Sequence, residues 1–116
     1  MRVLVADDDN VSRTLLTRTL HEWNFDVAAY ADGETAWTRL REDKPAIAIL
    51  GWAIAALTGL ELCRRIRLDP EIAYLYVLLL SPNSRQHAVA ALDAGADDYL
   101  AKPCLERFED LRRSPC

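Results

Sequence analysis

Short apolar runs alternate along the chain with longer segments in which apolar residues recur at helical spacing. The runs have the length of β-strands and occupy residues 3–5, 26–30, 46–50, 75–80 and 99–101. Between them, residues that share one helical face are Val11, Leu15, Leu16, Leu20 and Trp23, then Leu62, Cys63 and Ile66, then Ala88, Ala91 and Leu92. The pattern predicts five strands that alternate with helices.

The two middle runs, 46–50 and 75–80, are apolar without interruption, which is typical of strands that helices cover on both faces. The chain is therefore expected to form a parallel sheet in a three-layer α/β/α sandwich. The helix boundaries carry suitable residues, with Asp9 or Asn10, Asp32 and Ser84 as N-caps and Gly95 as a left-handed C-terminal residue.

The length and the net charge of the chain limit the classes of function that it can have. The 116 residues, half of them hydrophobic, are expected to form a single domain over residues 1–116. A net charge of -4 with no basic tract argues against binding to nucleic acid or a membrane surface. No apolar segment reaches the roughly 18 residues that cross a bilayer, and no signal-peptide pattern is present, so we expect a cytoplasmic protein. Three distant cysteines, Cys63, Cys104 and Cys116, indicate reduced thiols.

Polar residues gather where the predicted strands end, the usual place for ligands in open parallel sheets. Residues 7–9 are three aspartates, Gly51 and Trp52 follow the third strand, Ser81 follows the fourth and Lys102 the fifth. Adjacent carboxylates repel one another and call for a cation, either Mg²⁺ or the Lys102 ammonium. For the triplet alone, a solvated acidic turn remains an equal alternative.

These residues, in this order, resemble the receiver domain of two-component response regulators. The resemblance covers nearly the whole chain and is carried by VLVADDDN (3–10), GLELCRRIR (59–67) and ALDAGADDYLAKP (91–103). It implies a flavodoxin-like (βα)5 fold with strand order 2-1-3-4-5. By position, it implies an Mg²⁺-binding pair at Asp7 and Asp8, a switch hydroxyl at Ser81, a rotating aromatic at Tyr99, a phosphate-contacting Lys102 and a candidate cis-proline at Pro103.

The family's phospho-acceptor aspartate corresponds in this chain to Gly51. Glycine has no side chain to receive a phosphoryl group, and no carboxylate lies between Asp43 and Glu61. The apolar residues 53–57 also depart from the family's pattern. We interpret the site as a naturally degenerate acceptor site rather than as the result of a single replaced residue.

Loss of the acceptor removes one anionic ligand, so Mg²⁺ binding is expected to be weak. Asp7 and Asp8 can pair instead with Lys102, which would hold the pocket in one state. Ser81 and Tyr99 are either parts of a switch or packing residues. The loop 52–57 either folds inward, with Trp52 or Ile54 filling the acceptor site, or forms a docking surface. We expect His21 and His87 on helix surfaces, and no Ser–His pair at the strand ends.

Three functions are compatible with this pattern. The first is a receiver-like module without enzymatic activity, which acts through contacts with a histidine kinase, an output domain beyond residue 116, or another regulator. A homodimer through helix 4, strand 5 and helix 5 is one such contact. The second is a phosphorelay receiver that is modified at another residue. The third, a small-ligand or enzyme domain, is disfavoured by the acidic residues 7–9. Candidate interaction residues are Trp52, Ile54, Arg85, Val89, Tyr99 and Phe108.

Overall fold

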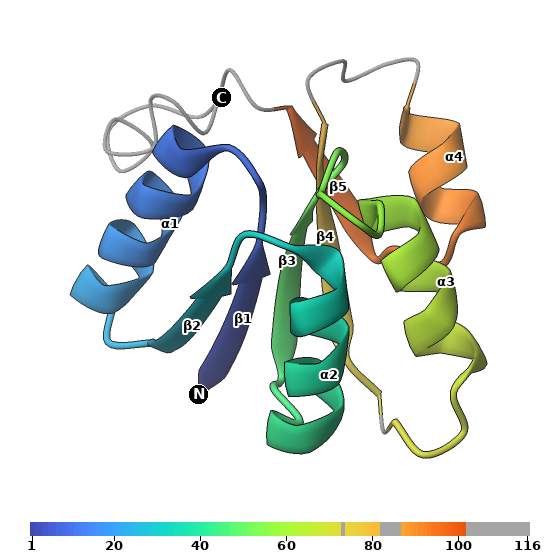
Figure 1. The fold of residues 1–116 in the computed structure, drawn as a ribbon, viewed down its shortest axis with the longest axis horizontal. Helices are drawn as coiled ribbons and strands as arrows, with labels where there is room; N and C mark the ends of the chain where they lie inside the picture. The colour runs from blue at the N-terminus through green and yellow to red at the C-terminus, as the bar shows by residue number, and fades with distance from the viewer. Residues whose placement is uncertain (73, 82–86, 102–116) are drawn as a thin grey trace.

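The structure is a computed structural model that describes residues 1–72, 74–81 and 87–101. Strands and helices alternate along these residues (Figure 1). They are β1 (Arg2–Ala6), α1 (Asn10–Glu22), β2 (Asp26–Tyr30), α2 (Gly33–Asp43), β3 (Ile47–Gly51), α3 (Gly59–Leu68), β4 (Tyr76–Ser81), α4 (Ala88–Asp93) and β5 (Asp98–Ala101). The helix expected after the fifth strand lies outside the described residues.

The five strands form one sheet in the order β2-β1-β3-β4-β5, and all neighbours are parallel. The predicted fold class and strand order are therefore confirmed. The register pairs Ala6 with Leu50, Gly51 with Leu80 and Ser81 with Ala101. The carboxyl ends of β1, β3, β4 and β5 consequently meet at one edge of the sheet.

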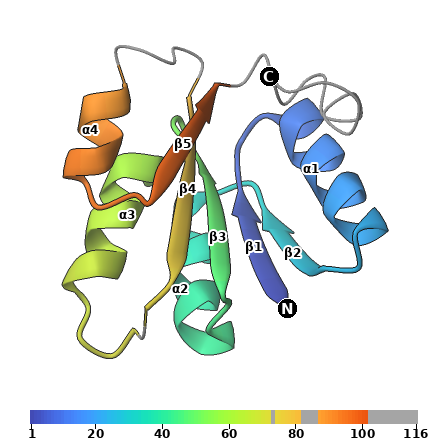
Figure 2. The same cartoon turned by 180° about the vertical axis from the view of Figure 1, so that it is seen from behind.

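Helices cover both faces of this sheet, as the two ribbon views show (Figures 1 and 2). One hydrophobic cluster joins Val3 and Val5 of β1 to Leu16 and Leu20 of α1. The other cluster joins the alternate residues of the same strands to α2, α3 and α4 and contains Leu40, Leu62, Ile66 and Ala91. Because successive strand residues point to opposite faces, burial on both faces explains why the middle strands are apolar throughout.

The expected caps are present where the structure describes them. Asp9 and Asp32 accept hydrogen bonds from Val11 and Glu34 amides, at 3.2 and 2.9 Å, and so begin α1 and α2. Gly95 follows α4 with φ of 102°, a conformation that suits glycine. Ser84 lies outside the described residues, and α4 begins at Ala88.

The expected buried face of α1 is partly wrong. Val11 and Trp23 are 60% and 41% exposed. The buried stripe of this helix runs instead through Ser12, Leu16, Thr19 and Leu20. Two small polar side chains, Ser12 and Thr19, are therefore buried beside Leu16 and Leu20, while Val11 and Trp23 remain exposed. Among the described helices, each is too short or too polar to span a bilayer.

Candidate functional site

The first acidic residue of the triplet is buried at the end of β1. Asp7 has no exposed surface, its amide donates to the Tyr30 carbonyl at 3.1 Å, and its Oδ1 accepts from the Asp9 amide at 3.0 Å. Asp8, in contrast, is exposed to solvent. The chain thus directs one carboxylate of the predicted pair into the protein and leaves the other at the surface.

Gly51 is the last residue of β3 and lies against Asp7. A Cβ atom added at Gly51 would lie 2.8 Å from both Cγ and Oδ1 of Asp7, closer than such atoms approach in proteins. The Asp7 carboxylate therefore takes the space that a side chain at position 51 would need. The Asp7 carboxylate thus lies next to position 51, and the alternative in which Trp52 or Ile54 fills the acceptor site stays a prediction.

The apolar loop after β3 folds inward. Ile54 and Leu57 are 5% and 3% exposed and belong to the core beneath α2 and α3. The Gly33 amide donates to the Ala55 carbonyl at 2.9 Å, which attaches the loop to the start of α2. Ile54 is therefore not a surface interaction residue, since burial of its aliphatic side chain stabilises the core.

The hydroxyl at the end of β4 is held by a histidine. Ser81 is fully buried, and its Oγ lies 2.5 Å from Nδ1 of His87, with which it forms a hydrogen bond. The His87 ring stacks on the Trp52 ring, with centroids 3.9 Å apart and planes 4° from parallel. Stacked aromatic rings at such spacing add to the stability that burial provides.

Two expectations about histidine are therefore wrong. His87 does not lie on a helix surface, and a Ser–His pair does exist at a strand end. Because α4 begins at Ala88 rather than soon after Ser84, His87 lies at the helix start, next to the strand ends. The Ser81 hydroxyl has no exposed surface, so this pair does not present a nucleophile to solvent. His21 is exposed, as expected.

The remaining predicted site residues lie near this edge or outside the described residues. Tyr99 pairs in register with Leu79 and packs partly buried against the core. Val89 on α4 is 68% exposed, whereas Trp52 is half-buried. Arg85, Lys102, Pro103 and Phe108 lie outside the described residues.

The carboxylates at this edge suit Mg²⁺ in kind but are few. Asp7 and Asp8 offer the hard oxygen ligands that the ion prefers. Within residues 1–72, 74–81 and 87–101, no group of three or more His, Cys, Asp or Glu side chains is placed to hold a metal ion. Water and main-chain oxygens would have to complete the coordination of an ion bound here.

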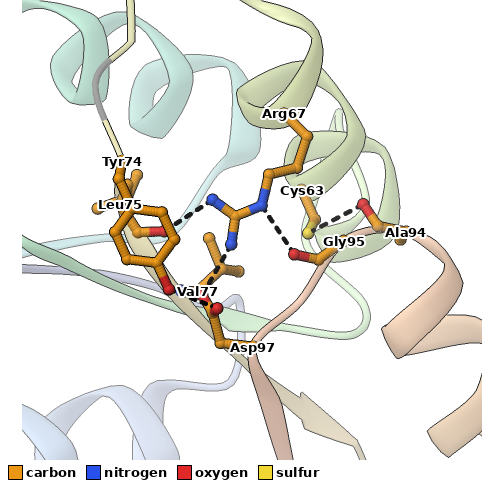
Figure 3. A network of polar contacts seen from close by, with 8 residues as sticks. All are labelled: Cys63, Arg67, Tyr74, Leu75, Val77, Ala94, Gly95 and Asp97. Carbon is orange, nitrogen blue, oxygen red and sulfur yellow. Dashed lines mark hydrogen bonds and ion pairs between the residues drawn. The ribbon is translucent and has the colours of Figure 1, made fainter.

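A denser polar network lies at the opposite edge of the sheet (Figure 3). The Arg67 guanidinium, on α3, donates to the carbonyls of Gly95 and Leu75 and to the Asp97 carboxylate, each at 2.7 Å. Asp97 also accepts from the Tyr74 hydroxyl at 2.5 Å and from the Val77 amide at 2.8 Å. The network joins the end of α3 to the segments that lead into β4 and β5.

This network shifts the pKa values of its members. Burial acts to raise the pKa of Asp97, but hydrogen bonds from Tyr74 and Val77 and the Arg67 charge outweigh it, so the pKa lies below 3.8. The hydrogen bond to Asp97 raises the pKa of Tyr74 above 10.0. Burial raises the pKa of the nearby Cys63 thiol, which donates to the Ala94 carbonyl at 3.3 Å.

Arg67 and Asp97 lie inside the motifs that carry the resemblance, but their sequence positions alone indicate no role for either residue. A cavity of about 660 Å³ lies at this same edge, between the end of α2 and the segment before β4. Trp37, Lys44, Pro45, Ile72 and Tyr74 are among its lining residues. Neither feature contacts the strand ends at which the acidic residues and Ser81 lie.

Comparison with known proteins defines the class to which this fold and this arrangement of residues belong. The family model described as "Response regulator receiver domain" matches residues 3–113. A relative that is 36% identical over 110 residues, the transcriptional regulatory protein AfsQ1 of Streptomyces coelicolor, is matched over 95% of this chain and 48% of its own length. The phosphate regulon transcriptional regulatory protein PhoB of Rhizobium meliloti is 35% identical over 103 residues, 88% of this chain and 45% of its own.

Solved structures of response regulators and receiver domains have the same fold as this chain. A response regulator from Chloroflexus aurantiacus superposes with a TM-score of 0.83 at 28% identity and covers 96% of this chain and 94% of its own. The receiver domain of the sensor histidine kinase PA1611 from Pseudomonas aeruginosa has a TM-score of 0.81 at 25% identity and covers 94% and 93%. The chain belongs to the response regulator receiver domain family. It spans about half the length of the curated relatives it matches.

Proposed function

We propose that this receiver domain is a signalling module that works without phosphorylation of an aspartate, because Gly51 occupies the acceptor position. The observation that supports this most directly is the contact between Gly51 and Asp7. The last residue of β3 has no nucleophilic atom, and a Cβ there would meet the Asp7 carboxylate at 2.8 Å. No carboxylate lies between Asp43 and Glu61 to replace the missing one.

The domain then acts through protein contacts rather than as an enzyme. Its partners are a histidine kinase, an output domain or another regulator in the cytoplasm, without direct contact to nucleic acid or membrane. Residues 1–116 form the receiver domain of this proposal, and an output domain follows, as the larger size of the relatives suggests. Val89 and Leu92 on α4, which are 68% and 56% exposed, favour a homodimer through α4 and β5, together with the expected fifth helix, which lies outside the described residues.

Magnesium has a minor place in this proposal. The PA1611 receiver structure holds a magnesium ion in its active-site cleft. In this chain Asp7 and Asp8 would supply the carboxylate oxygens, and their affinity is low because the acceptor carboxylate is missing. In this proposal Lys102, which lies outside the described residues, competes with the ion for the same carboxylates. Bound Mg²⁺ would neutralise the negative charge of the acidic turn.

The test is the intact mass of the protein after incubation with acetyl phosphate and Mg²⁺, beside Gly51→Asp and Gly51→Asn. We expect the unmodified chain and Gly51→Asn to keep their mass, and Gly51→Asp to gain one phosphoryl group. Asn matches Asp in size but has no nucleophilic carboxylate, so it controls for the displacement of Asp7. A phosphoryl group on the unmodified chain would overturn the proposal and favour the second function, a receiver phosphorylated at another residue.

A further inference from the structure

One side chain connects three elements at the carboxyl edge of the sheet. The His87 imidazole stacks on Trp52, which follows β3, at a centroid distance of 3.9 Å. Its Nδ1 lies 2.5 Å from the Oγ of Ser81, the last residue of β4. The His87 carbonyl accepts from the Ala91 amide at 2.9 Å and so begins α4. The start of this helix is therefore tied to the ends of two strands through one ring.

The chemistry of these groups explains why the contact is stable. The buried Ser81 hydroxyl needs a hydrogen-bond partner, and a neutral imidazole nitrogen can supply one in either tautomer, because a hydroxyl both donates and accepts. The face of the imidazole is covered by the indole. His87 makes no side-chain capping bond to α4, so its ring nitrogen is used by β4 and not by its own helix.

The helix itself buries little side-chain surface. Among its six residues, Ala88–Asp93, the buried one is Ala91. Such a short helix is unstable alone and depends on tertiary contacts. A methyl group contributes little area to the core, so among the described residues the contacts of His87 add substantially to what fixes the start of α4.

We propose that His87 is a positioning residue that holds the Ser81 hydroxyl and the start of α4 in one state without a phosphoryl group. The inference rests on the proposed function, in which Ser81 has no aspartyl phosphate to bind. His87 is then one internal partner of the switch hydroxyl, and Trp52 is the support that keeps the imidazole in place.

Amide hydrogen exchange of the full chain tests this role. In His87→Ala we expect the Ala91 and Ala94 amides of α4 to exchange about tenfold faster. The reason is that local opening of α4 in this variant no longer has to break the hydrogen bond to Ser81 and the stacking on Trp52. The Val77 amide, bonded to Asp97 at the other edge, serves as internal control and keeps its rate. His21→Ala, at an exposed histidine of α1, is the matched control variant and leaves α4 unchanged.

Two conservative variants separate the hydrogen bond from the stacking. His87→Asn keeps a polar atom for Ser81, whereas His87→Phe keeps the aromatic face for Trp52. We expect each to restore part of the protection, with a remaining increase of about threefold, and the benefit of Asn over Ala to disappear when Ser81 is also changed to Ala. Full protection in His87→Phe would show that the bond to Ser81 is dispensable and would overturn the proposal, as would unchanged exchange in His87→Ala.

The experiment contains no phosphoryl donor, so its result is independent of the mass measurement. Uptake of a phosphoryl group by the unmodified chain would overturn the proposed function whatever the exchange rates are. Exchange that does not respond to His87, in a chain that takes up no phosphoryl group, would overturn the role of His87 and leave the proposed function standing.

Discussion

The two edges of the sheet carry polar clusters of opposite character. At the amino edge, the Arg67 guanidinium makes three hydrogen bonds of 2.7 Å, one to Leu75, eight residues away, and two to Gly95 and Asp97, 28 and 30 residues away. At the carboxyl edge, Asp7 lies against Gly51, and Ser81 forms a hydrogen bond with His87. The denser network is the one around Arg67, which lies away from the site that the resemblance to receiver domains predicts. A high density of polar contacts therefore does not by itself locate a functional site.

The difference follows from what each cluster must satisfy. Arg67 donates hydrogen bonds to the main-chain carbonyls of Leu75 and Gly95, where the chain enters β4 and β5, and so helps to satisfy these acceptors. At the carboxyl edge, in contrast, the buried carboxylate of Asp7 lies next to Gly51, which has no side chain. Substitutions at the amino edge should therefore affect stability, whereas those at the carboxyl edge should affect local arrangement.

The largest effect is expected for Arg67→Met. The change removes three hydrogen bonds and leaves a partly buried Asp97 carboxylate, 22% exposed, without its counter-charge. We expect the free energy of unfolding to fall by about 2 to 3 kcal/mol in urea denaturation. Arg64→Met, at an exposed arginine of the same helix, is the control and should cost little. Equal losses in the two variants would contradict the contrast between the edges.

A smaller effect is expected at Gly51. In Gly51→Ala the new Cβ meets the Asp7 carboxylate at 2.8 Å, and the carboxylate must move. We expect a loss of about 1 kcal/mol, measured by the same denaturation. In the background of Asp7→Ala the substitution should cost nothing, because the clash is gone. A cost that persists there would place the strain elsewhere, for example at the close approach of Gly59 to the Gly51 carbonyl.

The smallest effect concerns the pH dependence of the amino edge. Because the folded state lowers the pKa of Asp97 below 3.8, its contribution is fully present above pH 3.8 and is lost as the pH falls through the lowered pKa. Tyr74→Phe removes one of the hydrogen bonds that lower it, so the pKa of Asp97 should rise toward 3.8. A carbon-13 NMR titration of the Asp97 carboxylate measures the change. An unaltered titration curve would show that the hydrogen bond from the Tyr74 hydroxyl does not lower the pKa of Asp97.

The sequence pattern predicted the strands and the N-caps Asp9 and Asp32, because these depend on periodicity and on local hydrogen bonds, whereas the order of the strands followed from the resemblance to receiver domains. It could not predict the Arg67 network, since a guanidinium finds carbonyl partners at distances in sequence that no local pattern encodes. It also misplaced His87 and Ile54. Both errors arise from loops, where the position of a side chain depends on which neighbouring elements leave space for it.

The order of the strands also bears on the way the molecule forms. β1 pairs with β2 and β3, all within the first 51 residues, whereas β5 joins through β4 alone. During synthesis from the amino terminus, the first three strands can assemble before β4 has left the ribosome. Asp7 and Gly51 would then meet in a nascent chain that has not yet acquired Ser81 or His87. In such an order of events the carboxyl edge would form in two stages, with the contact between β1 and β3 present before β4 and β5 add to the sheet.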